Sequence, residues 1–247
     1  MVVLLSPGVT AYEALGTYGV FRRTSGTTVR MVGDRPGRVG AHGCKVALMA
    51  ECAYRDIAVA DVIVVPGGLG ARRLVDDLEV TDWLSSRHET AQWTIGISTG
   101  SALLSAAGLL DGQDATTHWL ATDLLEDRGV HAVPERMVRS GRIVTATGAV
   151  SGLEAALFVV GRVRGQAEAD RVRGHLDEEL TGTLAANKPV GEDTLAALSG
   201  VPGSDELAPY VTAIDGPGRR SRAARRWTRS SRTSRSGRID VVDTSPR

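Results

Sequence analysis

Two short apolar runs, each stopped by a glycine-containing turn, constrain the fold of this chain more than any other feature. Asp61-Val-Ile-Val-Val65 is a β-branched run that ends abruptly at Pro66-Gly67-Gly68. Thr94-Ile-Gly-Ile97 ends at Ser98, before a segment rich in Ala and Leu. A short apolar run with so sharp a stop is typical of a strand buried in a parallel sheet. The two runs therefore predict two parallel strands, each followed by a tight turn.

Helical patterns alternate with further predicted strands along the first two thirds of the chain. Strands are expected at Val2 to Leu5, Thr28 to Val32, about 115–118, and at 136–139 and 142–146 around a hairpin turn at Ser140-Gly141. Helices are expected after the Pro7-Gly8 turn, with Ala11, Ala14, Leu15 and Tyr18 on one face, and at about 71–77, 79–90, 101–110, 119–127 and 153–163. This alternation predicts an α/β fold, a mostly parallel sheet sandwiched by helices.

The C-terminal part of the chain differs in composition from the rest. Residues 216–247 carry ten arginines against two aspartates, a balance of +8, and residues 1–215 carry −8 because the whole chain is neutral. We expect an α/β domain over residues 1–178, an extension of unassigned structure over 179–215, and an Arg- and Ser-rich disordered tail over 216–247. The tail is interpreted as an extension that folds back on the acidic body, with contact to nucleic acid or another polyanion as the alternative.

Composition and motif content exclude several classes of protein. No apolar run approaches the roughly 18 residues of a membrane-spanning helix, and the N-terminus lacks the pattern of a signal peptide, so a cytoplasmic protein is expected. Cys44 and Cys52 are too few for a disulfide framework and form no Cys-x-x-Cys pair, so no zinc site is predicted. Residues 166–247 show no convincing helix-turn-helix pair, which argues against a DNA-binding regulator.

Gly96-Ile97-Ser98-Thr99-Gly100 matches the Gly-x-Ser-x-Gly nucleophile elbow, with a strand before it and a helix after it. The glycines let the chain reverse tightly and lift the central side chain above the sheet. The amides that open the following helix favour negative charge there. Ser98 is therefore predicted to be the centre of an active or ligand-binding site, the alternative being a plain tight turn.

Ser98 needs a base, because an unassisted hydroxyl is a weak nucleophile. Glu13, on the first predicted helix near the same edge of the sheet, is the best-placed candidate, although it also fits a solvated helix-face carboxylate. The histidines His118, His131 and His175 have no spacing that identifies a triad base.

A second predicted element of the site is a pair of backbone amides. Gly68 and Thr99 each follow a parallel strand, so amides near them are expected to stabilise an oxyanion jointly. The alternative is that the glycines at this position are needed only to form the turn.

Six ordered motifs lie within the segment of about residues 2 to 165 over which the chain resembles a known family. They are Pro7-Gly-Val-Thr-Ala-Tyr-Glu13, Asp61-Val-Ile-Val-Val-Pro-Gly-Gly68, Ser98-Thr-Gly100, Gly108-Leu-Leu-Asp-Gly112, Ala115-Thr-Thr-His-Trp119 and Val144-Thr-Ala-Thr-Gly148. With these motifs the chain resembles the ThiJ/PfpI superfamily, most closely its isocyanide hydratase branch and the amidotransferase-like sensor domains of some AraC-type regulators. The resemblance implies a flavodoxin-like, class I glutamine amidotransferase-like fold, a small-molecule substrate or ligand and a homodimer, with neither metal nor cofactor.

The resemblance also implies the roles of individual residues, and several depart from the family pattern. Ser98 stands where the family has its nucleophilic cysteine, and Glu13 where the hydratase branch looks to have aspartate. Gly68, Leu69 and Thr99 are expected to bind the ligand, together with Gly16-Thr17, which replaces the family's Gly-Pro. A late Gly-x-Ser-x-Gly-x-Asp loop has become Gly148-Ala-Val-Ser-Gly-Leu-Glu154. A thiolate is accessible near neutral pH whereas a serine alkoxide is not, so the family's usual thiolate chemistry is absent.

Three hypotheses about function follow from the resemblance and from the elbow motif. The resemblance implies an enzyme that hydrates an isocyanide to an N-substituted formamide, with Ser98 as nucleophile or water-orienting hydroxyl and Glu13 as proton shuttle. A second hypothesis is a ligand-binding or sensor member that kept the pocket and lost the chemistry. A third, an α/β-hydrolase suggested by the elbow alone, needs a longer sheet after the elbow, and the strand pattern fades after residue 146.

Overall fold

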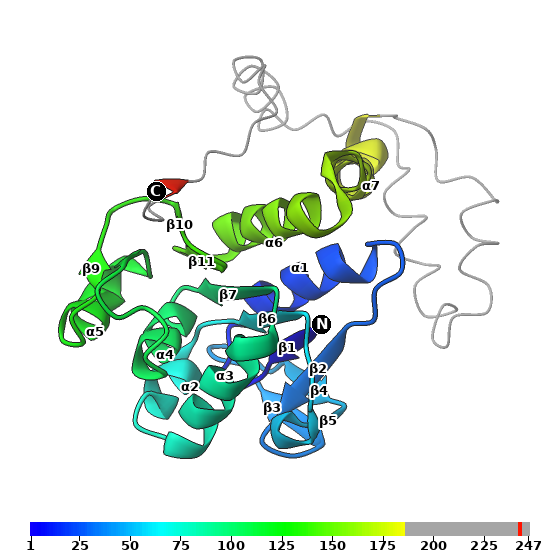
Figure 1. Cartoon of the computed structure of the whole chain (residues 1–247). Helices are drawn as coiled ribbons and strands as arrows, with labels where there is room; N and C mark the ends of the chain where they lie inside the picture. Colours follow the sequence, from blue (N-terminus) through cyan, green and yellow to red (C-terminus); the bar gives the residue numbers. More distant parts are fainter. Residues whose placement is uncertain (186–241, 244–247) are drawn as a thin grey trace. The chain divides into compact units, whose positions relative to one another are not determined.

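The computed structural model describes residues 1–185 and 242–243 (Figure 1). The chain divides into two units, Met1–Gly174 with Ile239–Arg247, and His175–Arg238. Apart from residues 175–185, which belong to the second unit, the fold described below is that of the first unit. Most of the predicted extension over 179–215 and of the predicted tail lies outside the described residues. No helix among the described residues combines the length and the apolar composition that crossing a membrane requires.

The core of the first unit is an eight-stranded sheet in the order β12-β10-β11-β7-β6-β1-β2-β5. Its strands are β1 (Val2–Leu4), β2 (Arg30–Gly33), β5 (Cys52–Ala53), β6 (Val62–Val65), β7 (Trp93–Ile97), β10 (Met137–Ser140), β11 (Ile143–Ala146) and β12 (Val242–Asp243). Every pair is parallel except the β10–β11 hairpin. The predicted mostly parallel sheet is confirmed.

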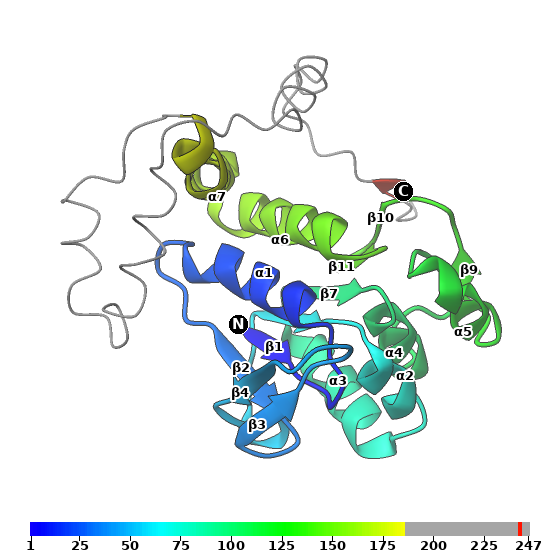
Figure 2. The same cartoon turned by 180° about the vertical axis from the view of Figure 1, so that it is seen from behind.

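Helices cover both faces of this sheet (Figures 1 and 2). On one face, α1 (Ala11–Arg22) packs beside α6 (Ala149–Arg164), which contacts β7 and β11. On the other, α4 (Gly100–Ala106) lies on β6 and β7 and contacts α2 (Leu69–Leu74) and α3 (Leu78–Thr90). Because β6 is covered on both faces, all four of its residues are buried, and this explains why the strand is apolar throughout. The remaining helices are α5 (Thr122–Glu126), α7 (Gln166–Ala185) and the 3₁₀ turns η1 (Tyr54–Asp56) and η2 (Trp119–Ala121).

Two small strand pairs complete the unit. They are the hairpin β3 (Gly37–Gly40) with β4 (Ala47–Ala50), and the parallel pair β8 (Asp114–Ala115) with β9 (His131–Ala132). The sequence prediction contained neither strand of the first pair, and of the second pair only β8 overlaps a predicted strand, the one expected at about 115–118. The β3–β4 hairpin fixes the loop that leads into α1: the Gly8 amide donates to the Gly40 carbonyl at 2.7 Å, and the His42 amide to the Val9 carbonyl at 2.9 Å. This small hairpin therefore helps to position the start of α1.

Several predicted boundaries were wrong for local reasons. The helix expected to end at Leu110 ends at Ala106, because Gly108 adopts a positive φ of 73° two residues later. The helix expected to begin at Leu153 begins at Ala149, where the Ser151 hydroxyl accepts a hydrogen bond from the Gly148 amide at 3.1 Å. The segment expected as one helix over 119–127 is η2 followed by α5.

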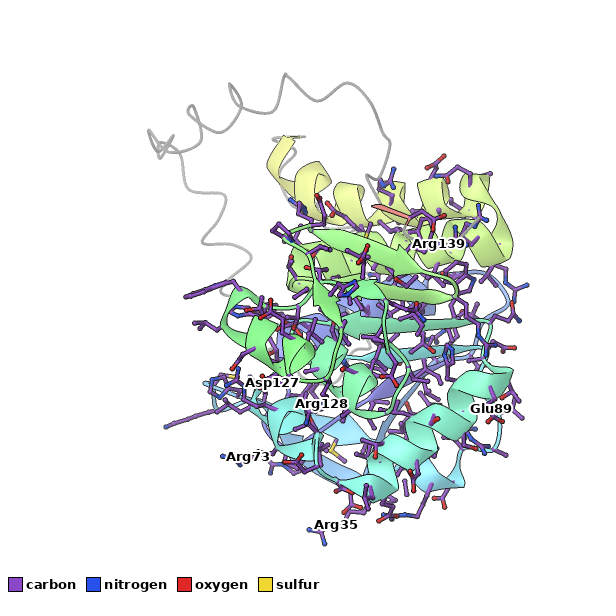
Figure 3. The ribbon with its side chains drawn as sticks, turned by 60° about the vertical axis from the view of Figure 1, so that its left-hand side comes forward. Arg35, Arg73, Glu89, Asp127, Arg128 and Arg139 are labelled. Carbon is purple, nitrogen blue, oxygen red and sulfur yellow. The ribbon has the colours of Figure 1, made fainter. Side chains whose placement is uncertain are left out.

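The end of the chain also corrects a prediction. Val242 and Asp243 fall inside the segment expected to be a disordered tail, yet they form β12 at the edge of the sheet, with Val242 opposite Val138. The Asp243 carboxylate lies 2.7 Å from the Arg139 guanidinium, which supports this pairing. Arg139 lies at the surface of β10 (Figure 3).

Candidate functional site

The turn between β7 and α4 has the geometry of a strained elbow. Ser98 has a φ of 55°, and it is the one non-glycine residue with positive φ in the part of the chain that the structure describes. A Cβ at Gly100 would lie 2.0 Å from the Val65 carbonyl oxygen, so that position admits only glycine. The Ser98 amide donates to the Ala146 carbonyl at 2.7 Å, and the Ser98 carbonyl accepts from Thr117 Oγ1 at 2.7 Å. Neighbouring segments thus hold the strained conformation in place.

The turn after β6 lies directly against this elbow. A Cβ at Gly67 would be 2.8 Å from Ser98 Cβ, so the absence of a side chain at Gly67 permits the close approach. The Gly67 carbonyl accepts from the Thr10 amide at 2.8 Å, and the Gly67 amide donates to Glu13 Oε2 at 2.7 Å. The two turns and the first turn of α1 therefore meet at the carboxyl edge of the sheet, where ligands of open α/β sheets bind.

Glu13 is the buried carboxyl of this meeting point. It is 4% exposed, and no ion pair to it is found within the described residues. Burial raises the pKa of Glu13 from 4.5 to about 7, although hydrogen bonds from the Gly67 amide and the Ser98 side chain act in the opposite direction. A carboxyl with a pKa near neutrality is suited to both giving and accepting a proton.

The Thr99 side chain changes the expected role of the Gly68 amide. Thr99 Oγ1 accepts from the Gly68 amide at 2.8 Å and donates to the Gly68 carbonyl at 2.9 Å. The Gly68 amide, predicted to bind an oxyanion, is therefore already engaged. The amides of Leu69 and Thr99 have no acceptor among the described residues, and they are the donors that remain.

These side chains surround one hollow of about 480 Å³, called the site hollow below. It is lined by Thr10, Tyr12, Glu13, His42, Gly68, Leu69, Arg72, Ser98, Thr99, His118 and Leu120. The structure thus brings together five of the seven predicted site residues: Ser98, Glu13, Gly68, Leu69 and Thr99.

The other two predicted residues lie elsewhere. Gly16 is at the contact of α1 with α6, where a Cβ would be 3.1 Å from a methyl group of Leu153. Thr17 is 1% exposed, and its hydroxyl donates to the Glu13 and Ala14 carbonyls at 2.9 and 3.1 Å. Their placement serves helix packing and gives no support to a binding role.

The three histidines considered as bases are also separated. His118 lines the site hollow, and its Nδ1 accepts from the Leu120 amide at 3.2 Å while its ring stacks on Trp119. His131 is exposed on β9, with its Nδ1 3.3 Å from Asp114 Oδ1. His175 belongs to the second unit. Within the described residues, no hydrogen bond joins Ser98 to a histidine.

Sequence reasoning missed several residues of the site hollow. His42 follows the hairpin strand β3, which carries too little apolar alternation to be recognised. Arg72 is an exposed helix residue outside every motif, and Tyr12, also exposed, was noted only as part of the Pro7-Gly-Val-Thr-Ala-Tyr-Glu13 motif. Thr117, which holds the Ser98 carbonyl, was signalled only as part of the Ala115-Thr-Thr-His-Trp119 motif.

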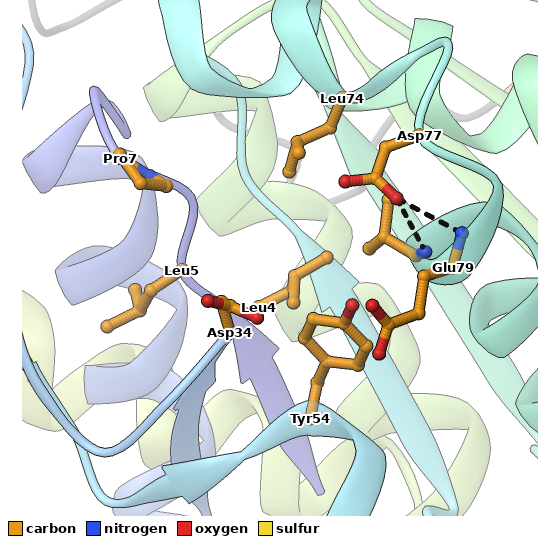
Figure 4. Close-up of a pocket in the computed structure, with 9 residues that line it drawn as sticks. Leu4, Leu5, Pro7, Asp34, Tyr54, Leu74, Asp77 and Glu79 are labelled. Carbon is orange, nitrogen blue, oxygen red and sulfur yellow. Dashed lines mark hydrogen bonds between the residues drawn. The ribbon is translucent and has the colours of Figure 1, made fainter.

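A second cavity, of about 270 Å³, opens at the same edge of the sheet and holds three carboxylates (Figure 4). Asp77 accepts from the amides of Glu79 and Val80 at 3.0 and 3.4 Å, which caps α3. Asp34 and Glu79 pair with the Arg55 guanidinium at 2.8 and 2.7 Å. These carboxylates cap a helix or form exposed ion pairs, and none of the predicted site residues lines this cavity.

Comparison with known proteins places these observations in a family. Residues 1–161 match the profile of the DJ-1/PfpI family. An isonitrile hydratase of Pseudomonas putida is 34% identical over 175 residues, which cover 70% of this chain and 76% of that protein. The HTH-type transcriptional regulator GbdR of Pseudomonas aeruginosa is 28% identical over 174 residues, covering 61% of this chain but only 46% of the regulator.

Solved structures agree on the fold. A ThiJ/PfpI family protein from Pseudomonas syringae has a TM-score of 0.67 at 24% identity, covering 87% of this chain and 88% of the other. DJ-1beta of Drosophila melanogaster has a TM-score of 0.65 at 23% identity, covering 71% of this chain and 95% of the other.

Proposed function

Because this chain belongs to the DJ-1/PfpI family, we propose that it is an isonitrile hydratase-like enzyme, which adds water to a small isocyanide to give an N-substituted formamide. The observation that carries the proposal is the buried pair of Ser98 and Glu13 in the site hollow, with the pKa of Glu13 raised to about 7. The 34% identity to an isonitrile hydratase over most of that protein's length supports the choice of reaction.

In the proposed first step, the neutral Glu13 carboxyl gives its proton to the terminal isocyanide carbon. Ser98 Oγ bonds to the same carbon, and the Ser98 hydroxyl proton passes to the Glu13 carboxylate. The product is a formimidate ester, R–N=CH–O–Ser98. Protonation of the carbon makes it strongly electrophilic, so a serine hydroxyl suffices where a less activated carbon would need a thiolate.

In the second step, water adds to the formimidate carbon and Glu13 moves a proton from this water to the nitrogen. The bond from carbon to Ser98 Oγ then breaks, the serine regains its proton, and the formamide R–NH–CHO leaves. We assign the Leu69 and Thr99 amides as hydrogen-bond donors to the oxygen of the added water, where negative charge develops as this water loses its proton. An alternative within the same proposal is that Ser98 orients a water molecule that attacks directly.

The test is formamide formation from a small isocyanide by the full-length protein. Wild type is expected to be active and Ser98→Ala to lose at least about 100-fold in kcat/KM. Ser105→Ala is the matched control, because this buried serine of α4 has a hydroxyl without a hydrogen-bond partner among the described residues, and its activity should be unchanged. Inactivity of folded wild-type and Ser98→Cys proteins alike would exclude the hydratase proposal.

A second candidate is a ligand-binding or sensor protein that kept the pocket without turnover. It is favoured by the engagement of the Gly68 amide with Thr99 and by the absence, within the described residues, of a hydrogen bond from Ser98 to a histidine. An inactive wild type beside an active Ser98→Cys variant would support this candidate, because only the nucleophile would then be missing.

The proposal includes a homodimer in the cytoplasm that binds a small molecule without a metal or cofactor. Light scattering on the purified full-length protein measures the number of subunits, and a monomeric mass would contradict the dimer.

A further inference from the structure

The site hollow has an uneven distribution of charged groups. Glu13 is the one carboxyl among its lining residues, and it is buried against Gly67 and Ser98. The same walls carry the Arg72 guanidinium and the imidazoles of His42 and His118. An organic cation would find no second carboxylate there, whereas an anionic group would meet a permanently charged guanidinium.

Arg72 is held in place at the rim of this hollow. It comes from α2, and its Nη2 donates to the Leu120 carbonyl at 2.6 Å, which ties α2 to η2. A guanidinium has five N–H donors in a planar fork. For the other Arg72 donors, no acceptor is found in the part of the chain that the structure describes. Arg72 thus presents an oriented guanidinium with open donors to the same space as Ser98.

We propose that the substrate of the site hollow is a carboxylate-bearing isocyanide, with its carboxylate bound by Arg72 and its isocyanide carbon at Ser98. This inference rests on the proposed function and specifies its substrate class. A single planar guanidinium matches a planar carboxylate. The volume of about 480 Å³ lies within the range of small-molecule sites and accommodates a short chain between the two groups.

Kinetics with matched substrates test this substrate class. For 3-isocyanopropanoate, we expect kcat/KM to exceed that for its methyl ester by roughly five- to tenfold, the effect of one partly exposed charge-assisted contact. Arg72→Gln should bring the two values together, and Arg72→Lys should keep part of the preference. Arg73→Gln is the control, because Arg73 follows Arg72 on α2, is exposed and does not line the site hollow (Figure 3). Equal values in the wild type, or a preference that survives Arg72→Gln, would overturn the inference.

Binding measurements separate this inference from the proposed reaction. Calorimetry with Ser98→Ala should show tighter binding of N-formyl-β-alanine than of its methyl ester, and this preference should disappear in Ser98→Ala/Arg72→Gln. If no isocyanide is hydrated but this preference is found, the reaction is wrong and the carboxylate site stands. Equal binding, or no detectable binding of either compound, would overturn the carboxylate site whatever the kinetics. Thermal unfolding of each variant checks that the fold is retained.

Discussion

Two hollows at the carboxyl edge of the sheet, the site hollow and the second cavity, use carboxyl groups in opposite ways. In the site hollow, Glu13 is buried without a cation, and its pKa rises to about 7. In the second cavity, Asp77 caps a helix (Figure 4), and Asp34 and Glu79 share Arg55 at the surface. A buried carboxyl without a cation is destabilising but chemically active, whereas paired carboxylates stabilise local structure. This difference is the reason why the proposed reaction is assigned to the site hollow and not to the second cavity.

The largest expected effect is a loss of activity in Glu13→Gln that is absent from Glu79→Gln. Glu13→Gln should lower kcat/KM for isocyanide hydration by about 100- to 10,000-fold, because the amide cannot give or accept the proton. In the wild type, kcat/KM should fall as pH rises through about 7, because Glu13 then loses the proton that the first step needs. Steady-state kinetics across pH measure both effects. Glu79→Gln is the control and should leave rate and profile unchanged, so an equal loss in both variants would contradict the comparison.

A second prediction concerns stability. The Glu13 carboxyl ionises at about 7 in the folded state and near 4.5 when unfolded, so its burial costs stability progressively as pH rises between these values. By pH 8 this cost reaches about 3 kcal/mol. Glu13→Gln removes it, so the variant should gain that amount relative to wild type between pH 4 and 8.

The difference in unfolding free energy between wild type and Glu13→Gln separates the effect of Glu13 from that of His88, whose effect on stability has the opposite pH dependence. Burial lowers the pKa of His88 to about 4, so the His88 contribution to stability is lost as pH falls through the window from 6.5 to 4. This contribution is common to wild type and Glu13→Gln and cancels in the difference. Urea unfolding at several pH values measures the difference, and a constant offset would show that the pKa of Glu13 is not raised.

The contrast between the two hollows was only partly accessible to sequence reasoning. The strands β6 and β7 were predicted because they are buried on both faces and leave an apolar run. Ser98 and Glu13 were found because an elbow and a first-helix acid have local patterns. His42 and Arg72 were not, because they reach the site hollow through contacts between distant segments, such as that of Gly8 with Gly40. Such contacts leave no pattern in the local sequence.

A smaller effect is expected from the helix cap in the second cavity. Asp77→Ala removes the acceptor for the Glu79 and Val80 amides at the start of α3, and this should cost about 1 kcal/mol of unfolding free energy. Asp76→Ala is the control, because Asp76 is exposed and its contact with Arg128 is long at 3.5 Å. Chemical denaturation measures both variants, and equal losses would mean that Asp77 does not act as a cap.

The smallest effect is expected for Arg55→Gln, which removes both ion pairs of the second cavity. The partners Asp34 and Glu79 are largely exposed, so water and salt screen the attraction, and ordering three long side chains opposes it. Released carboxylates also remain solvated, unlike Glu13. The midpoint of urea unfolding should therefore move less than for Asp77→Ala, and the difference from wild type should shrink further at high salt. A loss that exceeds the effect of Asp77→Ala and persists at high salt would show that this cavity, too, contains charges whose burial matters, and the contrast with the site hollow would no longer hold.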